Sequence, residues 1–143
     1  MTLTKHEKQI CDNVRYFFKH DFERYSQLAE LADLADLKSV RYDAINSSTN
    51  TNRQEDKVIN ASYYQEITDT VIKVVERMRD KKLKSVIKYR YFEHLSVWQI
   101  AERMQYSEST IKQLINKALL LFAEMLAIIT DIDLRKDDYI EKH

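Results

Sequence analysis

The residues best suited to chemistry in this sequence lie along one edge of a helix predicted over residues 108–129. By helical periodicity, the polar side chains Glu108, Ser109, Lys112, Gln113, Asn116 and Lys117 point outward. Gln, Asn and Ser side chains hydrogen-bond to base edges, and lysine ammonium groups bind phosphates. This edge, together with Ser107 at the helix start, therefore predicts a surface that recognises duplex DNA. An ordinary helical bundle with a solvated outer face is the alternative interpretation of the same pattern.

Two helix-start signals lie just before this edge, eleven residues apart. Ser96 is an N-cap with Gln99 three residues later, which is the capping-box pattern, and Ser107 caps the next helix. Helices predicted over 97–104 and 108–129 must therefore cross after a short turn, which is the helix-turn-helix arrangement. Gln105 occupies the turn position where glycine is usual, at a cost of roughly 1 kcal/mol.

Positive charge is concentrated around this corner. Residues 81–119 contain eight Lys and Arg against three Asp and Glu, whereas the segments before and after them are net negative. Lys84 and Lys88, within a helix predicted over 82–92, are the main candidates for clamping the DNA backbone beside the corner. The neighbouring Lys81, Lys82 and Arg90 could contribute to the same contact.

The rest of the chain reads as long helices joined by one polar loop. Residues 5–34 predict a helix with an apolar core stripe that includes Leu31, with a break left open at 19–21. Residues 38–53 predict a loop rich in Ser, Thr and Asn, and 54–80 predict a second long helix. We therefore expect a helical region over 1–80, a helix-turn-helix domain over 81–130 and a frayed acidic tail over 131–143.

Composition excludes several classes of protein. The chain of 143 residues contains no glycine and no proline, which argues against β-rich folds and against glycine-rich phosphate loops, so we expect an all-α fold. Cys11 is the only cysteine and the four histidines are scattered, so we expect no disulfide, metal site, cofactor or catalytic residues. No transmembrane segment or secretion signal is evident, which predicts a cytoplasmic protein. Because the sequence shows no catalytic motif and no glycine-rich phosphate loop, we expect that it is not an enzyme. Trp98 and Tyr106 are predicted to pack in the core or the turn.

The segment LKSVIKYRYFEHLSVWQIAERMQYSESTIKQLINKALLLFAEML resembles the C-terminal part of the ArpU/RinA-type phage transcriptional regulators, which in turn resembles the promoter-recognition domain of sigma factors. Upstream, NVRYFF followed by Asp21-Phe22, and then DLKS at 36–39, are similar to the N-terminal pattern of the same family. Members of that family carry glycine in the helix-turn-helix turn and proline and glycine in the loop, and this chain lacks both.

The resemblance implies a regulator of phage or prophage origin that binds promoter DNA in a bacterial host and activates late or lysis-related genes. Host RNA polymerase and a second copy of the chain are left open as further partners. An alternative is a DNA-packaging oligomer that resembles a small terminase subunit, in which the long helices would build a ring. A third hypothesis is a sigma-like module that docks on polymerase without reading DNA.

Overall fold

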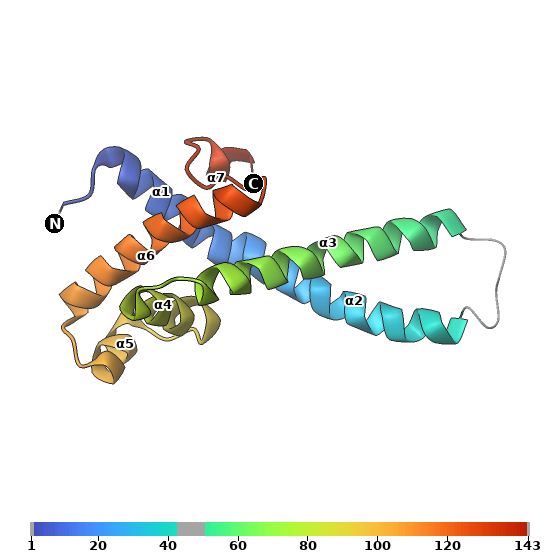
Figure 1. The fold of residues 1–143 in the computed structure, drawn as a ribbon, viewed down its shortest axis with the longest axis horizontal. Coiled ribbons are helices and arrows are strands. Elements are labelled where there is room, and N and C mark those ends of the chain that lie inside the picture. The colour runs from blue at the N-terminus through green and yellow to red at the C-terminus, as the bar shows by residue number, and fades with distance from the viewer. Residues whose placement is uncertain (1, 43–50, 143) are drawn as a thin grey trace. The chain divides into compact units, whose positions relative to one another are not determined.

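The protein is an all-α molecule in the part of the chain that its structure describes. The computed structural model describes residues 2–42 and 51–142, and within these ranges it contains helices and no strand (Figure 1). In chain order the elements are α1 (Lys5–Tyr16), η1 (Phe17–Asp21), α2 (Phe22–Tyr42), α3 (Thr51–Glu76), α4 (Lys81–Ile87), η2 (Lys88–Phe92), α5 (Val97–Met104), α6 (Glu108–Ile129) and α7 (Tyr139–Lys142). The predicted fold class is confirmed. None of the helices described here is long and apolar enough to cross a membrane.

The chain divides into two compact units, but not at the expected boundary. One unit contains residues 1–20 and 72–143, which we call the core unit, and the other contains residues 21–71, which we call the hairpin unit. We expected residues 1–80 to be separate from 81–130. Instead α1 belongs to the core unit, where it packs against α6, and Phe17 and Phe18 of the following η1 turn both lie against Phe122.

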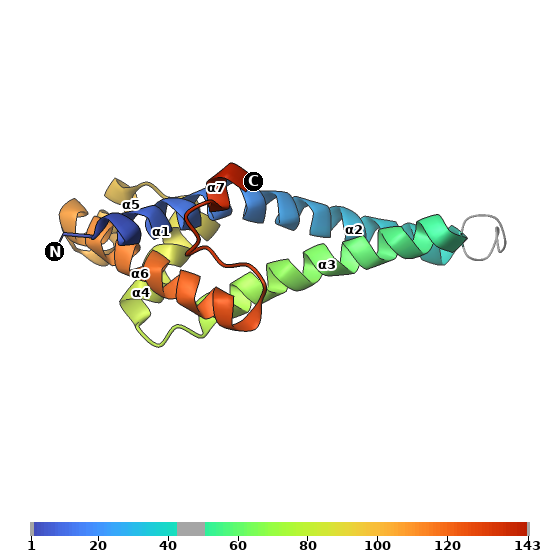
Figure 2. The same cartoon turned by 90° about the horizontal axis from the view of Figure 1, so that it is seen from above.

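The core unit is held together by aliphatic and aromatic side chains from α1, α4, α5 and α6. Figure 2 shows these four helices gathered in one part of the chain. Val86, Ile100, Ile111 and Leu119 are fully buried, as the helical periodicity predicts. Removing such side chains from water is the main favourable contribution to folding, about 1.5–3 kcal/mol for each one. This core fixes the positions of α5 and α6, which carry the predicted DNA-binding edge.

Two π-helical turns, η1 and η2, supply the aromatic part of that core. At the break that we left open at 19–21, the π turn η1 interrupts the α-helix and separates α1 from α2. Phe18 of η1 stacks on Tyr91 of η2 with ring centroids 4.6 Å apart and lies 4.8 Å from Phe122 of α6. A π turn adds one residue to a helical turn, and here it lets the neighbouring Phe17 and Phe18 both be buried.

The hairpin unit consists of α2 and the larger part of α3, which run side by side in opposite directions (Figures 1 and 2). Tyr25 of α2 stacks on Tyr64 of α3 at 5.8 Å between centroids and meets Tyr63 edge-on at 6.4 Å. Tyr25 and Ile67 are buried as predicted, whereas Leu31, which we expected in the core, is 54% exposed. The apolar side chains of α2 are therefore only partly covered, since Tyr25 is buried and Leu31 is exposed.

The polar loop predicted over 38–53 is shorter than expected. Helix α2 continues to Tyr42 and α3 begins at Thr51, so both ends of that segment are helical, and residues 43–50 lie outside the described part of the chain. Ser, Thr and Asn weaken helix interiors but are well suited to helix starts, which accounts for α3 beginning within the polar run.

The second long helix also ends earlier than the predicted residue 80. Helix α3 stops at Glu76 and α4 starts at Lys81, with Asp80 as its N-cap. The Asp80 carboxylate accepts hydrogen bonds from the backbone N–H groups of Lys82 and Leu83, at 2.9 and 3.3 Å. Residue 80 caps α4 and does not continue α3, because Asp is favoured at an N-cap and disfavoured inside a helix.

The acidic tail is packed rather than frayed. Leu134 is fully buried, and the amide of the buried Asn13 donates to the backbone carbonyls of Leu134 and Lys136, at 2.9 and 2.8 Å. Tyr139 at the start of α7 is also buried and meets Tyr16 of α1 edge-on. The many charges of this segment led us to predict fraying. The buried side chains of Leu134 and Tyr139 and the hydrogen bonds from Asn13 hold it against α1 instead.

Candidate nucleic-acid interface

The corner between α5 and α6 begins with a complete capping box. The Ser96 hydroxyl accepts from the backbone N–H of Gln99 at 3.2 Å, and the Gln99 side chain accepts from the backbone N–H of Ser96 at 2.9 Å. These bonds satisfy two groups that a helix start otherwise leaves open, and they fix the first turn of α5. The predicted bounds of α5 and α6 coincide with the observed ones.

The turn is a Schellman motif with glutamine in place of glycine. Gln105 has φ 62° and ψ 42°, which is the left-handed conformation that the sequence position predicts. The backbone N–H of Tyr106 donates to the carbonyl of Ala101 at 3.1 Å, and that of Gln105 to the carbonyl of Glu102 at 3.4 Å. A single left-handed residue thus ends α5 and redirects the chain toward α6.

Ser107 completes the corner as the N-cap of α6. Its hydroxyl accepts from the backbone N–H of Thr110 at 3.1 Å and bonds to the Thr110 hydroxyl at 2.9 Å. We predicted Ser107 both as a cap and as a DNA-binding residue. The geometry commits its side chain to the cap.

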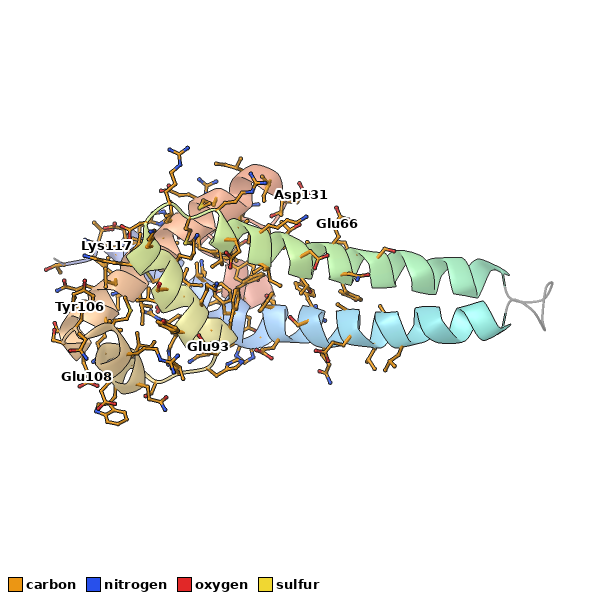
Figure 3. All side chains as sticks on the ribbon, turned by 60° about the horizontal axis from the view of Figure 1, so that its bottom comes forward. Glu66, Glu93, Tyr106, Glu108, Lys117 and Asp131 are labelled. Atoms are coloured by element: carbon orange, nitrogen blue, oxygen red, sulfur yellow. The ribbon has the colours of Figure 1, made fainter. Side chains whose placement is uncertain are left out.

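The predicted edge of α6 is largely available to a partner. Five of its six outward side chains are exposed, namely those of Glu108, Ser109, Lys112, Gln113 and Lys117. On the opposite side of the helix Ile111, Ile115 and Leu119 are buried in the core unit. Figure 3 shows the side chains of Glu108 and Lys117 on this part of the chain, together with Tyr106 from the turn. We call the five exposed residues the reading edge.

Asn116 is separated from the reading edge by contacts with α1. The guanidinium of Arg15 donates from Nη2 to the Asn116 side-chain oxygen, and the buried Cys11 thiol lies 3.6 Å from the Asn116 backbone carbonyl. Arg15 also donates to Asp12 at 3.2 Å. Asn116 is therefore half-buried and already hydrogen-bonded, unlike the free amide that the pattern predicted.

The two lysines predicted to clamp the DNA backbone are only partly free. The Lys88 ammonium lies 2.8 Å from the Glu76 carboxylate, and Lys84 is half-buried. Hydrogen bonding and charge attraction from Lys88 lower the pKa of Glu76, and Glu76 in turn raises the pKa of Lys88. Because the Glu76 pKa is depressed, the pair is intact at neutral pH and is lost as the pH falls through that lowered value.

Comparison with known proteins assigns the region around the α5–α6 corner to a known type of domain. Residues 80–120 match the family model Sigma-70, region 4. These residues form a sigma-like helix-turn-helix. The match covers less than a third of the chain, and no match to the chain was found among curated proteins or among solved structures. A helix-turn-helix of this type binds DNA in transcription, so the coarse prediction of a DNA-binding transcription domain is confirmed.

The sigma-like helix-turn-helix carries an exposed tryptophan that the sequence interpretation placed wrongly. Trp98, expected in the core or the turn, is 58% exposed on α5 and lines a shallow depression with Leu95 and Glu102. Helical periodicity could have predicted this exposure, because position 98 lies outside the face of α5 that carries Ile100, Ala101 and Met104. Tyr106 does pack at the turn, where the Lys82 ammonium lies 5.5 Å from its ring centroid.

Two elements outside the matched residues complete this domain. Helix α1 contacts α6 through Arg15 and Cys11, Phe17 of η1 also lies against α6, and the segment before α7 is tied to α1 by Asn13. No spacing in the sequence predicts these contacts, since the partners lie about a hundred residues or more apart. The sigma-like helix-turn-helix in this chain is thus supported on one side by an N-terminal helix.

Proposed function

We propose that this protein is a transcription regulator of the ArpU/RinA type, encoded by a phage or prophage, that binds promoter DNA through its sigma-like helix-turn-helix. The observation that carries the proposal is the reading edge of α6, which is polar, exposed and placed directly after a fully capped corner. Helix-turn-helix proteins insert the N-terminal residues of their second helix into the major groove. The start of α6 has the exposure and the chemistry for that role.

Each member of the reading edge has a distinct part in this interaction. Gln113 and Ser109 read base edges, with Gln suited to a bidentate contact with adenine, and Glu108 accepts from cytosine N4. Lys112 and Lys117 bind phosphates on either side of the groove. Asn116 is held by Arg15 and does not read bases, so base reading is confined to the first two turns of α6.

The protein acts by occupying DNA rather than by catalysis. Bound beside a promoter, it would contact host RNA polymerase and activate late or lysis-related genes. Promoter DNA and polymerase are its expected partners, and no cofactor is required. We expect a purified sample to show no hydrolytic or transfer activity.

Selection of duplexes from a random pool by the full chain tests this function. Enriched duplexes should share one motif, and a footprint on such a duplex should cover it. Transcription by bacterial RNA polymerase from a promoter carrying that motif should then change when the protein is added. Recovery of no common motif would refute sequence-specific promoter recognition.

The hairpin unit favours a second candidate, a DNA-packaging oligomer that resembles a small terminase subunit. Leu31 and Leu34 on α2 are 54% and 56% exposed, and such apolar residues on a long helix suit contact with further copies. Light scattering after size-exclusion chromatography separates the two functions. A ring of many copies supports packaging, whereas a monomer or dimer that footprints one promoter supports regulation.

The exposed Trp98 favours the third hypothesis, docking on polymerase without DNA recognition. Tryptophan is enriched among residues that dominate binding to protein partners. Two results together would support such a docking module over the regulator. The variant with both Lys112 and Gln113 replaced by alanine would still bind polymerase, and the wild-type chain would bind no DNA.

A further inference from the structure

The turn between α3 and α4 carries four exposed cations within six residues. They are Arg77, Arg79, Lys81 and Lys82, which we call the basic turn. Arg77 and Arg79 were not among the residues predicted to bind DNA, and both precede the residues that match Sigma-70, region 4. The basic turn is therefore a feature that the helix-turn-helix pattern does not account for.

The conformation of the basic turn is fixed by its backbone and by one buried anchor. Met78, between the two arginines, is only 2% exposed, and its backbone N–H donates to the carbonyl of Val75 at 3.2 Å. On the other side Asp80 caps α4 through Lys82 and Leu83. The buried Met78 and the Asp80 cap fix the backbone of this turn, and the four cations lie exposed on its surface.

The carboxylates near the basic turn are already occupied. Glu76 is paired with Lys88 at 2.8 Å, and the Asp80 side chain accepts from backbone N–H groups. Within the part of the chain that the structure describes, no ion pair joins Arg77, Arg79 or Lys81 to a carboxylate. Like charges this close repel one another, so the surface favours an anionic partner.

A contact within the domain places the basic turn beside the reading edge. The Lys82 ammonium lies 5.5 Å from the ring centroid of Tyr106, and Tyr106 directly precedes Ser107, the N-cap of α6. Helices α4 and α6 pack against each other in this unit, and Val86 of α4 and Ile111 of α6 are both fully buried. A duplex that receives the start of α6 in its major groove thus brings a backbone strand toward the start of α4.

We propose that the basic turn is a second phosphate-binding surface, which grips the DNA backbone flanking the bases read by α6. This inference rests on the proposed function, since it names a further contact with the same duplex. Arg77, Arg79 and Lys81 each bind a phosphate and carry no sequence information. The surface raises affinity for all duplexes and extends the footprint on the side of the groove that the turn faces.

Salt titration of DNA binding tests this surface. The variant R77Q/R79Q/K81Q keeps Lys82 on Tyr106 and leaves the reading edge intact. Its affinity for a fluorescein-labelled 30-bp duplex of random sequence is measured by anisotropy between 50 and 200 mM KCl. Each phosphate contact contributes about 0.9 to the slope of log K against log salt, so three lost contacts lower the slope by about 2.7. Across this fourfold salt range, the affinity of the variant should change roughly 40-fold less than that of the wild type.

A charge-matched variant provides the control. K5Q/K19Q/K136Q removes three exposed lysines from other elements of the same unit, and its slope should stay close to the wild-type value. Circular dichroism checks that both variants keep their helical content. Equal slopes for the two variants would show an effect of net charge alone and would overturn the inference.

The remaining outcomes separate this inference from the proposed function. If the wild type binds duplexes and R77Q/R79Q/K81Q keeps its full slope, the basic turn does not bind phosphate, while the regulator function stands. If the wild type binds no duplex, both fail. Hydroxyl-radical footprinting then compares the variant with the wild type on a duplex selected from a random pool. The variant should lose protection on one flank of the site and keep it on the other. Loss on both flanks, or on neither, contradicts the proposed position of the surface.

Discussion

Replacing Gln105 by glycine measures the cost that the left-handed turn imposes on the corner. A non-glycine residue in this conformation costs about 1–2 kcal/mol because its Cβ approaches the backbone. Glycine also increases the freedom of the unfolded chain, which offsets about 0.4–1 kcal/mol of the gain. The side-chain bond from Gln105 to the carbonyl of Glu102, at 3.4 Å, is long and contributes little. We therefore expect Gln105→Gly to raise the free energy of unfolding by about 0.5–1 kcal/mol.

Urea unfolding followed by tryptophan fluorescence is a suitable assay for this change. Trp98 is the only tryptophan and lies on α5, so its emission reports on the corner. With a slope of about 2 kcal/mol per molar urea, the midpoint should rise by a few tenths of a molar, roughly 0.25–0.5 M.

Two control variants separate backbone conformation from loss of the side chain. Glu102→Gly, at an exposed right-handed position of the same helix, should destabilise by about 1 kcal/mol. Gln105→Ala keeps a Cβ and should give no stabilisation. If Gln105→Gly lowers the midpoint as much as Glu102→Gly, residue 105 is not left-handed and the reasoning about the corner is refuted.

Four further variants test the interface and its support. Gln113→Ala should reduce discrimination at one base pair by about 1–3 kcal/mol, seen as a broader motif among selected duplexes, and an unchanged motif would exclude Gln113 as a reader. Lys117→Ala should instead weaken binding to every duplex alike and lower the salt slope by about 0.9. Asn13→Ala leaves two carbonyls of the C-terminal segment without their donor and should cost about 1–3 kcal/mol in urea unfolding, whereas no change would mean that water replaces the amide. Glu76→Gln frees Lys88 and should raise the salt slope by about 0.9, so a constant slope would place Lys88 away from the duplex.

The helical class, the corner and the outward face of α6 follow from short-range patterns in the sequence. Hydrogen bonds such as those from Ser96 to Gln99 and from Ser107 to Thr110 join residues three positions apart, so residue types at fixed spacing predict them. The core stripe is equally local, because a helix returns every 3.6 residues to the same face. For this reason the bounds of α5 and α6 were predicted without error, whereas the ends of α2 and α3 were not.

The sequence by itself thus determined an all-α chain with an edge on α6 suited to DNA. Only the tertiary structure decided which polar groups on and around that edge are free. Arg15 holds Asn116 from 101 positions away, and Asn13 holds the C-terminal segment from 121 positions away. Lys88 is occupied by Glu76, while Trp98 is left exposed. Such pairings depend on how whole helices pack, and no local spacing encodes them, because residues far apart in the chain meet only after the core has brought their helices together.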